Sequence, residues 1–347
     1  MTLSALPPPH DHPVEQDAPP RHGGALAAAS LRHGIALVDW LDLSTGINPA
    51  PYSAGPAAAE DYARLPDPAS LAALLTAARR AYDVAAPAWV VPLPGSDLGL
   101  RLLPLLIQSG GVAVLQPTYS GHAEAWAGAG HTVASVAKLS EANGAEVVVL
   151  ANPNNPDGRL LSPDRILAAL AALPPHGLLV VDEAFADLEP RLSLAPHLAD
   201  ERLVVLRSFG KFYGLAGLRL GFALGTGDIV RRLAGVVGDW PLSGPAITIG
   251  TAALSDFAWQ DATRARLALD RSRLDALLAR HGLTIAGGTA LFRLVRTADA
   301  QALHESLARL GIWTRIFQDL PGAIRFGLPP ADGFDRLSRA LGEIRTP

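Results

Sequence analysis

Apolar residues follow two spacings along residues 21–245, and stretches with one spacing alternate with stretches of the other. Short continuous runs of valine, leucine and alanine predict buried strands. Between them, apolar residues recur every three or four positions, which predicts helices that bury one face. The expected strands are 111–115, 146–150, 177–181, 203–206 and 219–224, and the expected helices are 71–82, 98–108, 121–130 and 163–173. This alternation indicates an α/β fold with a mostly parallel sheet covered by helices.

The pattern changes after a break at residues 238–245. A long helical pattern at 256–281 is followed by shorter segments, and together they predict a smaller α+β C-terminal domain. Its expected strands are 291–295, 312–316 and 323–326, and its expected helices are 299–310 and 333–344. We therefore divide the chain into a disordered arm (1–20), an N-terminal arm of the small domain and active site (21–48), a large domain (49–245) and a small C-terminal domain (246–347). Ser70 is expected to cap the first helix of the large domain.

Composition narrows the class of protein. An apolar fraction of 49% and a charged fraction of 18% over 347 residues indicate a globular chain. The net charge of −4 gives no support for binding nucleic acid or an anionic membrane. The chain has no cysteine, which excludes disulfides, thiolate metal sites and cysteine nucleophiles, and we assign no metal site. It has no apolar run of about 18 residues and no signal-peptide pattern at its start, so we expect a cytoplasmic protein.

Lysine is rare in this chain. Of 29 lysine and arginine residues, only Lys138 and Lys211 are lysines. Lys211 lies in the stretch Ser208-Phe209-Gly210-Lys211-Phe212-Tyr213-Gly214, and Arg219 follows eight residues later. A lysine can lose its proton when it is desolvated and can form a Schiff base, whereas arginine stays protonated. The hypothesis is that Lys211 is a reactive amine and Arg219 binds an anion.

Asp182, Asn155 and Tyr119 share one position in the predicted fold, because each follows a predicted strand. Ligands of such sheets bind at the carboxyl ends of the strands. Asp182 follows a fully apolar strand, where it is either a structural hydrogen-bonded acid or the partner of a cationic heterocycle. Asn155 is equally consistent with a plain turn or a ligand contact, and Tyr119 with core packing or stacking on a flat ligand. Gly95, Ser96 and Asp97 open a helix and could bind a phosphate, although such residues also cap many helices that bind nothing.

Pyridoxal phosphate accounts for all of these positions at once. Lys211 would hold its aldehyde and Asp182 its pyridinium nitrogen. Asn155 would meet the ring hydroxyl, and Tyr119 would cover a face of the ring. The phosphate would be held by Ser96, Asp97, Ser208 and Arg219. A nucleotide-binding protein without catalytic activity is the less favoured alternative, because no Gly-x-Gly-x-x-Gly follows the first strand.

The chain resembles fold-type I pyridoxal-phosphate enzymes of the aminotransferase superfamily, over roughly residues 21–345. The motifs that carry the resemblance are the Lys211 stretch, Asn152-Pro153-Asn154-Asn155-Pro156-Asp157-Gly158 and Asp182-Glu183-Ala184-Phe185. The most similar branch is the histidinol-phosphate aminotransferase group. Within it, three further stretches resemble threonine-phosphate decarboxylases of cobalamin biosynthesis. These stretches are Arg21-His22-Gly23-Gly24, Leu43-Ser44-Thr45-Gly46-Ile47-Asn48-Pro49 and Ile324-Arg325-Phe326-Gly327-Leu328-Pro329. The resemblance implies a homodimer with the active site at the subunit interface.

Two positions depart from the pattern of the wider family. Phe185 stands where many relatives have a tyrosine, so one hydrogen bond to the ring oxygen is missing. Leu65 stands in Arg64-Leu65-Pro66 where aminotransferases usually have Arg-Tyr-Pro, whose tyrosine reaches the partner subunit's phosphate. Tyr62 is a candidate substitute for that tyrosine.

The substrate is expected to be a small phosphorylated amino acid. An arginine on an apolar strand needs an anionic partner, so Arg325 and Arg315 are expected to share the substrate's carboxylate and phosphate. The N-terminal arm is expected to close over the substrate through His22, Gly23, Gly46 and Asn48. The same residues serve decarboxylation or transamination, depending on which bond at Cα lies perpendicular to the ring. The resemblance favours decarboxylation of threonine phosphate, with an aminotransferase for histidinol phosphate or a related amine as the alternative.

Overall fold

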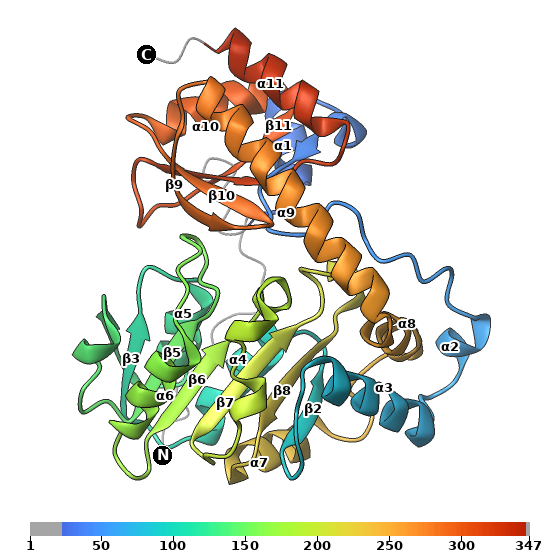
Figure 1. The fold of residues 1–347 in the computed structure, drawn as a ribbon, viewed down its shortest axis with the longest axis vertical. Coiled ribbons are helices and arrows are strands. Elements are labelled where there is room, and N and C mark those ends of the chain that lie inside the picture. Colours follow the sequence, from blue (N-terminus) through green and yellow to red (C-terminus); the bar gives the residue numbers. More distant parts are fainter. Residues whose placement is uncertain (1–22, 345–347) are drawn as a thin grey trace, which may run out of the picture.

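A computed structural model of the protein describes residues 23–344. The predictions for residues 1–20 and for His22 lie outside the described residues. A large α/β part occupies the lower half of Figure 1 and a smaller α+β part the upper half. The long helix α9 (Phe257–Arg280) runs from one part to the other. No helix within residues 23–344 has both the length and the apolar character needed to cross a membrane.

The large part is built on a seven-stranded sheet with the order β2-β8-β7-β6-β5-β3-β4. Its strands are β2 (Trp89–Leu93), β3 (Gly111–Leu115), β4 (Thr132–Val136), β5 (Val147–Ala151), β6 (Leu178–Asp182), β7 (Leu203–Ser208) and β8 (Gly221–Gly225). The pairs β3–β4, β3–β5, β5–β6 and β6–β7 are parallel, whereas β8 pairs antiparallel with β2 and β7. The predicted α/β fold with a mostly parallel sheet is confirmed.

Helices cover both faces of this sheet, which explains the continuous apolar runs of its central strands. Alternate residues of each strand enter two separate apolar clusters, one on each face. One face is covered by α3 (Pro68–Ala81), α6 (Pro163–Ala171) and α8 (Gly244–Ser255). The other is covered by α4 (Ser96–Leu102), α5 (Gly121–Gly128) and α7 (Asp228–Val237).

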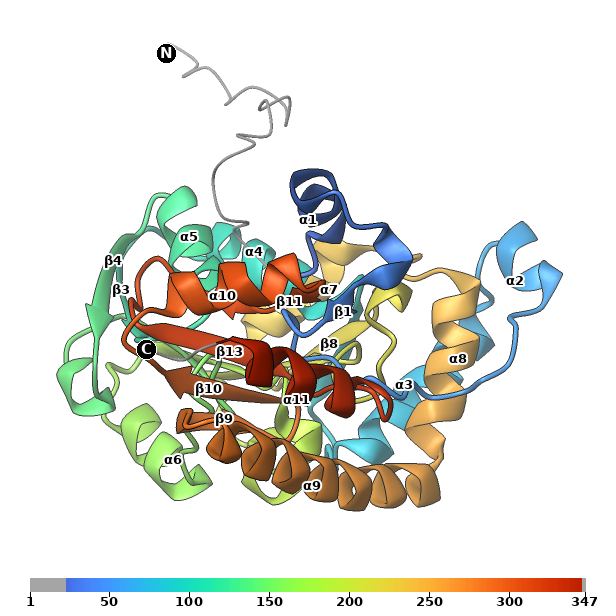
Figure 2. The ribbon, with the colours of Figure 1, turned by 90° about the horizontal axis from the view of Figure 1, so that it is seen from above.

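The small part contains a four-stranded antiparallel sheet with the order β12-β13-β10-β9. Its strands are β9 (Thr284–Thr289), β10 (Phe292–Arg296), β12 (Arg315–Ile316) and β13 (Ala323–Gly327). The N-terminal segment joins this part, because β1 (Leu41–Asp42) pairs in parallel with β11 (Ile312–Trp313). Figure 2 shows α1 (Leu26–His33) beside this strand pair, with α10 (Ala300–Arg309) and α11 (Gly333–Glu343) above the sheet. Segments from both ends of the chain therefore build the small part together.

Three local expectations need correction. Helix α3 begins at Pro68, and its N-cap is Asp67, whose carboxylate accepts a hydrogen bond from the backbone N–H of Ala69, so Ser70 lies within the helix and is not its cap. The edge strand β4 was not predicted, because four of its five residues are at least partly exposed and it lacks a continuous apolar run. Strand β9 was not predicted, because its two glycines interrupt the apolar pattern.

A buried ion cluster lies beneath the sheet's carboxyl edge. The guanidinium of Arg207 pairs with Glu183 at 2.8 Å and with Asp187 at 2.6 Å, and it stacks on the ring of Tyr82 at 4.2 Å. All three ionic side chains are almost fully buried. Removing the arginine would leave two carboxylates buried without their cation.

Arg207→Met should therefore lower the free energy of unfolding by about 3–5 kcal/mol, the cost of breaking a buried ion pair on one side. Urea unfolding followed by circular dichroism measures it. Arg231→Met is the matched control, because Arg231 pairs with Asp228 on the exposed surface of α7 and its loss should leave stability nearly unchanged. An equal change in the free energy of unfolding for the two variants would show that the buried ion pairs of Arg207 are not needed for stability.

Candidate active site

A cavity of about 310 Å³ lies at the carboxyl ends of the central strands. Its walls come from the large sheet, the N-terminal segment and the small sheet. The sequence-predicted residues that line it are Gly23, Gly46, Gly95, Ser96, Asp97, Tyr119, Asn155, Asp182, Ser208, Lys211, Arg219, Arg315 and Arg325. Such a cavity is the usual binding site of an α/β protein.

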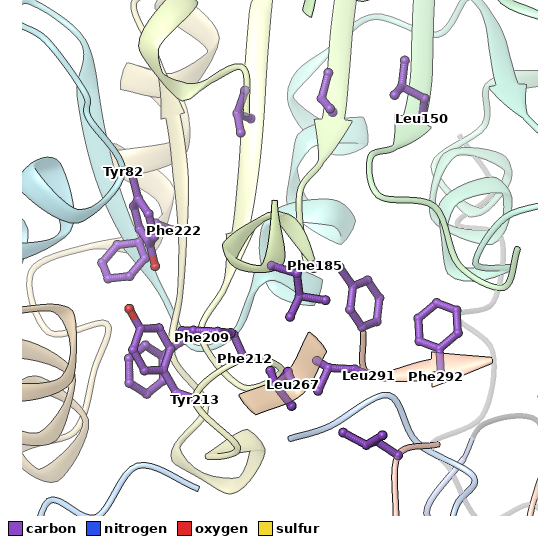
Figure 3. Close-up of a cluster of buried hydrophobic side chains, with 14 of the residues drawn as sticks. Tyr82, Leu150, Phe185, Phe209, Phe212, Tyr213, Phe222, Leu267, Leu291 and Phe292 are labelled. Atoms are coloured by element: carbon purple, nitrogen blue, oxygen red, sulfur yellow. The ribbon is translucent and has the colours of Figure 1, made fainter. Parts of the chain in front are cut away.

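Aromatic side chains fix the loop that carries Lys211. Phe209, Phe212 and Tyr213 are fully or almost fully buried. The rings of Phe209 and Tyr213 stack with centroids 4.3 Å apart, and Tyr213 stacks in turn on Trp259 of α9 at 5.6 Å. Figure 3 shows Phe209, Phe212 and Tyr213 packed together. This anchoring on both sides of Lys211 holds its backbone in place while its side chain faces the cavity.

The amine of Lys211 lies in a setting that favours its neutral form. The pKa of Lys211 is lowered to about 8, chiefly by burial; the positive charges of Arg325 and Arg219 contribute to this lowering, and Asp182 opposes it. Within residues 23–344, the Lys211 amine forms no hydrogen bond or ion pair. A partly deprotonated amine without a partner is the group that a carbonyl-containing cofactor needs.

Competitive acetylation of the cofactor-free protein should reveal this pKa. Labelling of Lys211 should rise with pH over about one unit on either side of 8 and then level off, because the amine is neutral above its pKa, whereas an ordinary lysine titrates near about 10.4. Peptide mass spectrometry follows both lysines in one sample, with the exposed Lys138 as internal reference. A Lys211 curve that keeps rising to an ordinary lysine midpoint would show that the amine is not perturbed.

Asp182 is held in place at the end of β6 by two contacts. Its Oδ1 accepts a hydrogen bond from the backbone N–H of Ala184 at 3.1 Å, and its Oδ2 lies 3.0 Å from Nε2 of His122. His122 is fully buried, and its other ring nitrogen lies 3.4 Å from the hydroxyl of Thr118. These contacts fix the orientation of the Asp182 carboxylate, which lines the cavity. Sequence reasoning missed His122, although its place three residues after Tyr119, at the start of α5, was a usable signal.

Backbone and guanidinium groups meet at the anion corner of the cavity, formed by Gly95, Ser96, Ser208 and Arg219. Gly95 has φ of +87°, and a Cβ there would collide with the guanidinium of Arg219. A Cβ at Gly221 would collide with the backbone nitrogen of Ser96, so β8 passes close to the start of α4. Ser208, at the end of β7, pairs with Gly221. The corner therefore combines backbone N–H groups, a hydroxyl and a cation, which is suitable for a phosphate.

Asp97 lines the cavity at the start of α4, and its side chain has partners of its own. Its carboxylate forms an ion pair with Arg101 at 2.8 Å, and its other oxygen lies 3.4 Å from the hydroxyl of Tyr119. A carboxylate repels a phosphate, so only the backbone of Asp97 remains suited to the anion corner. Its side chain instead connects Arg101 to the hydroxyl end of Tyr119.

Arg325 is the most constrained cation of the cavity. It is only 6% exposed, and its two terminal nitrogens donate to Oδ1 of Asn155 and to the carbonyl of Ser44, both at 2.6 Å. Its guanidinium carbon lies 5.0 Å from the centroid of the Phe292 ring. Its Nε is buried with no hydrogen-bond partner. No carboxylate pairs with Arg325 among the described residues, so an anionic ligand would complete its surroundings.

The N-terminal segment closes one side of the cavity. The backbone N–H of Gly24 donates to Oγ of Ser44 at 2.7 Å, and that hydroxyl donates to Asp42 at 2.6 Å. Gly23 lies against the backbone of Ser44, where a Cβ would collide with the carbonyl oxygen. Gly46 packs against the rings of Phe185 and Phe292, which lie edge to face at 5.3 Å.

Asn48 does not line the cavity, which corrects the expectation of a substrate contact. Its side chain is buried and donates to the carbonyl of Phe212 at 2.8 Å, while its oxygen accepts from Arg266 at 2.8 Å. Asn48 thus links the N-terminal segment to the loop that carries Lys211.

The two positions that depart from the wider family differ in their surroundings. Phe185 lines the cavity, whereas Leu65 is 71% exposed, and its candidate substitute Tyr62 is 74% exposed.

The sheet order, the lysine at its carboxyl edge and the second sheet above it define a fold-type I enzyme of the aminotransferase type. The chain belongs to the class I and II aminotransferase family, which matches residues 39–331. It is 43% identical to a threonine-phosphate decarboxylase of Pseudomonas aeruginosa, over 94% of this chain and 98% of that protein. It is 42% identical to a protein of the same name from a Sinorhizobium species, over 94% and 99%.

Solved structures show the same fold. A histidinol-phosphate aminotransferase from Sinorhizobium meliloti in complex with pyridoxal-5'-phosphate has a TM-score of 0.79 at 26% identity, over 99% of this chain and 98% of that one. An L-threonine-O-3-phosphate decarboxylase from Porphyromonas gingivalis has a TM-score of 0.72 at 20% identity, over 87% and 98%.

Proposed function

We propose that the protein is a pyridoxal-phosphate-dependent carboxy-lyase. It converts L-threonine O-3-phosphate to (R)-1-amino-2-propanol O-2-phosphate and CO2, in cobalamin biosynthesis. The substrate and the reaction are supported by the two decarboxylase relatives, which match nearly the whole chain. The observation that carries the proposal is one cavity in which Lys211 and Asp182 lie together with Arg315 and Arg325. It joins a reactive amine to two cations for a substrate with two anionic groups.

The residues of the cavity fit pyridoxal phosphate. Lys211 would hold its aldehyde and Asp182 its ring nitrogen, and the anion corner would hold its phosphate. The amide of Asn155 would donate to the ring oxygen, since its own oxygen is already used by Arg325. The fit rests on the unpartnered Lys211 amine and on the close approach of Arg219 to Gly95. When bound, the cofactor supplies a ring that accepts the electron pair of a breaking bond at Cα.

The side chains around this group would then direct the reaction. Asp182 would place its carboxylate beside the ring nitrogen and would favour the protonated form of that nitrogen. Arg325 would bind the substrate carboxylate, because it lies close enough to Lys211 to lower its pKa, and Arg315 would bind the substrate phosphate. The bond from Cα to the carboxylate breaks, CO2 leaves, and Cα takes up one proton. With a pKa of about 8, Lys211 can supply that proton near neutral pH.

Transamination is the second candidate, because the family contains aminotransferases. A histidinol-phosphate aminotransferase of Nitrobacter winogradskyi is 35% identical, although over only 52% of this chain and 52% of that protein. In that case Lys211 would remove the Cα proton, and an oxo acid would be needed as amino acceptor. Incubation with threonine phosphate in the absence of any oxo acid separates the two reactions. Release of CO2 supports the decarboxylase, and a strict need for an acceptor would overturn it.

Arg325→Ala should raise the KM for threonine phosphate by roughly 10²-fold or more, because a buried charge contact is lost. The visible absorption of the bound cofactor should stay unchanged, since Arg325 is assigned to the substrate. Steady-state kinetics and an absorption spectrum measure both effects. Arg296→Ala is the matched control, because Arg296 is exposed on the neighbouring strand β10. Loss of the cofactor band in Arg325→Ala would mean that the assignment to the substrate is wrong.

We also propose that the protein acts in the cytoplasm as a homodimer, as the resemblance to its family implies. Tyr62 and Leu65 near α2 (Ala59–Ala63), and Trp240 in the segment before α8, are apolar side chains that are 60–74% exposed in the single chain. Exposed apolar residues of this size are suited to an interface. Sedimentation of the purified protein at the mass of one chain would argue against the dimer.

A further inference from the structure

One short segment joins the small sheet to the loop that carries Lys211. At its start, the carbonyl of Ser44 accepts a hydrogen bond from Arg325 on β13 at 2.6 Å. Four residues later, Asn48 contacts the loop of Lys211. Residues 44–48 therefore connect the cation assigned to the substrate carboxylate with the amine assigned to proton transfer.

Asn48 binds two successive carbonyls of the Lys211 loop. Its backbone N–H donates to the carbonyl of Lys211 at 2.9 Å, and its side-chain amide donates to the carbonyl of Phe212 at 2.8 Å. These bonds fix two neighbouring peptide planes, and the Cα of Lys211 is part of the first. The segment stays against the loop after Asn48, because the backbone N–H of Tyr52 donates to the carbonyl of Tyr213 at 2.9 Å. The contacts determine where the lysine side chain begins.

The amide of Asn48 is itself held in one orientation. Its oxygen accepts from Nη2 of Arg266 on α9 at 2.8 Å and from the backbone N–H of Ala50 at 3.1 Å, which leaves the amide nitrogen directed at Phe212. Asn48 is only 2% exposed and does not line the cavity. Any effect of Asn48 on the reaction must therefore pass through Lys211.

We propose that Asn48 is a positioning residue, which holds Lys211 in the place relative to Arg325 that proton transfer to Cα requires. This inference rests on the proposed function for the reaction in which Lys211 acts. Arg325 would fix the substrate by its carboxylate, so Cα has a set position. The proton that leaves Nζ of Lys211 takes the place of the lost carboxylate on Cα, and this step depends on the separation of the two atoms.

Asn48→Asp tests the proposal with almost no change in volume. Aspartate keeps an oxygen for Arg266, with which it can form an ion pair, but it has no N–H to donate to the carbonyl of Phe212. The kcat should fall by roughly 10²-fold, the effect of displacing a reacting group by about 1 Å. It is expressed per lysine-bound cofactor, measured by visible absorption, so that unfolded molecules do not count. KM should change little, because the contacts of Arg325 remain.

Two further measurements need no substrate. When pyridoxal phosphate is added to the cofactor-free protein, the absorption of the lysine-bound form should appear about tenfold more slowly in Asn48→Asp, because the amine is misplaced. The amides of Asn48 and Tyr52, which donate to the Lys211 loop, should exchange with solvent faster by up to about tenfold, the equivalent of one lost hydrogen bond. Mass spectrometry of peptides from the two proteins measures this exchange.

Gln260→Glu is the matched control, since it also replaces a buried amide by a carboxylate. Gln260 is 3% exposed, donates to the carbonyls of Ala253 and Leu254 at 3.2 Å and does not line the cavity. It should lose stability but keep the native kcat per lysine-bound cofactor. Thermal unfolding verifies that each variant is folded, and Asn48→Ala replaces Asn48→Asp if the latter does not fold. A native kcat in the folded Asn48 variant, or an equal loss in Gln260→Glu, overturns the proposal.

The proposed function and the role of Asn48 fail separately. If the native enzyme releases no CO2 from threonine phosphate, the proposed function is wrong, and the rate of cofactor attachment still decides whether Asn48 positions Lys211. If CO2 is released and the Asn48 variant keeps the native kcat, the function stands and the positioning role is wrong.

Discussion

Replacing Lys211 with alanine should reduce turnover by on the order of 10⁴-fold, at the upper end of what one positioned acid–base group contributes. The visible absorption of the lysine-bound cofactor should disappear as well. Both effects follow from one cause, because the same amine would bind the cofactor's aldehyde and donate the proton to Cα. Absorption spectroscopy and a CO2 assay measure them on the same sample.

Lys138→Ala is the control for this change, because it removes the chain's other lysine, which is exposed and does not line the cavity. It should retain native activity and the native spectrum. A Lys211→Ala protein that kept the native absorption band would show that the cofactor is attached elsewhere or is absent from the native enzyme.

Asp182→Asn should lower kcat by roughly 10²–10³-fold, the usual effect of removing one preorganised electrostatic group. The asparagine keeps the shape and can still contact His122, which lies 3.0 Å from the aspartate, but it carries no charge to keep a ring nitrogen protonated. KM should change much less than kcat, because Asp182 is assigned to the cofactor.

Asp200→Asn provides the comparison, because Asp200 forms an ion pair with Arg202 outside the cavity. Steady-state kinetics on both variants separate a local effect from a general one. If Asp182→Asn keeps full kcat, the charge opposite the ring nitrogen is not needed and the role given to Asp182 is wrong.

The large sheet could be predicted from the sequence, because strands that are buried on both faces consist of continuous apolar residues. Strands such as β5 and β6 are nearly all apolar, since helices cover both sides. The antiparallel direction of β8 was not predictable. Its residues are as buried as those of its parallel neighbours, and a continuous apolar sequence does not show in which direction its strand runs. The pairing of β1 with β11 joins residues about 270 positions apart, which no local pattern reveals.

The residues assigned to the cofactor were easier to predict from the sequence than those assigned to the substrate. Asp182 and Ser208 are the last residues of β6 and β7, and Asn155 follows β5 of the same sheet, so the topology alone brings them together. Phe317 and Ser44 lie in other segments of the chain than Arg325 and contact it only in the folded protein, so no local sequence pattern predicts these contacts. The error at Asn48 has the same origin, because its partner Arg266 lies on helix α9, 218 positions away in the sequence.

Reaction in heavy water tests the central claim most directly. Threonine phosphate is incubated with the enzyme without any oxo acid, and the product is examined by mass spectrometry and NMR. The account predicts an amine that has lost its carboxyl group as CO2 and carries one solvent-derived deuterium on the former Cα, because one proton replaces the broken carbon–carbon bond. A product that keeps its carboxyl group and has lost its amine would contradict the account.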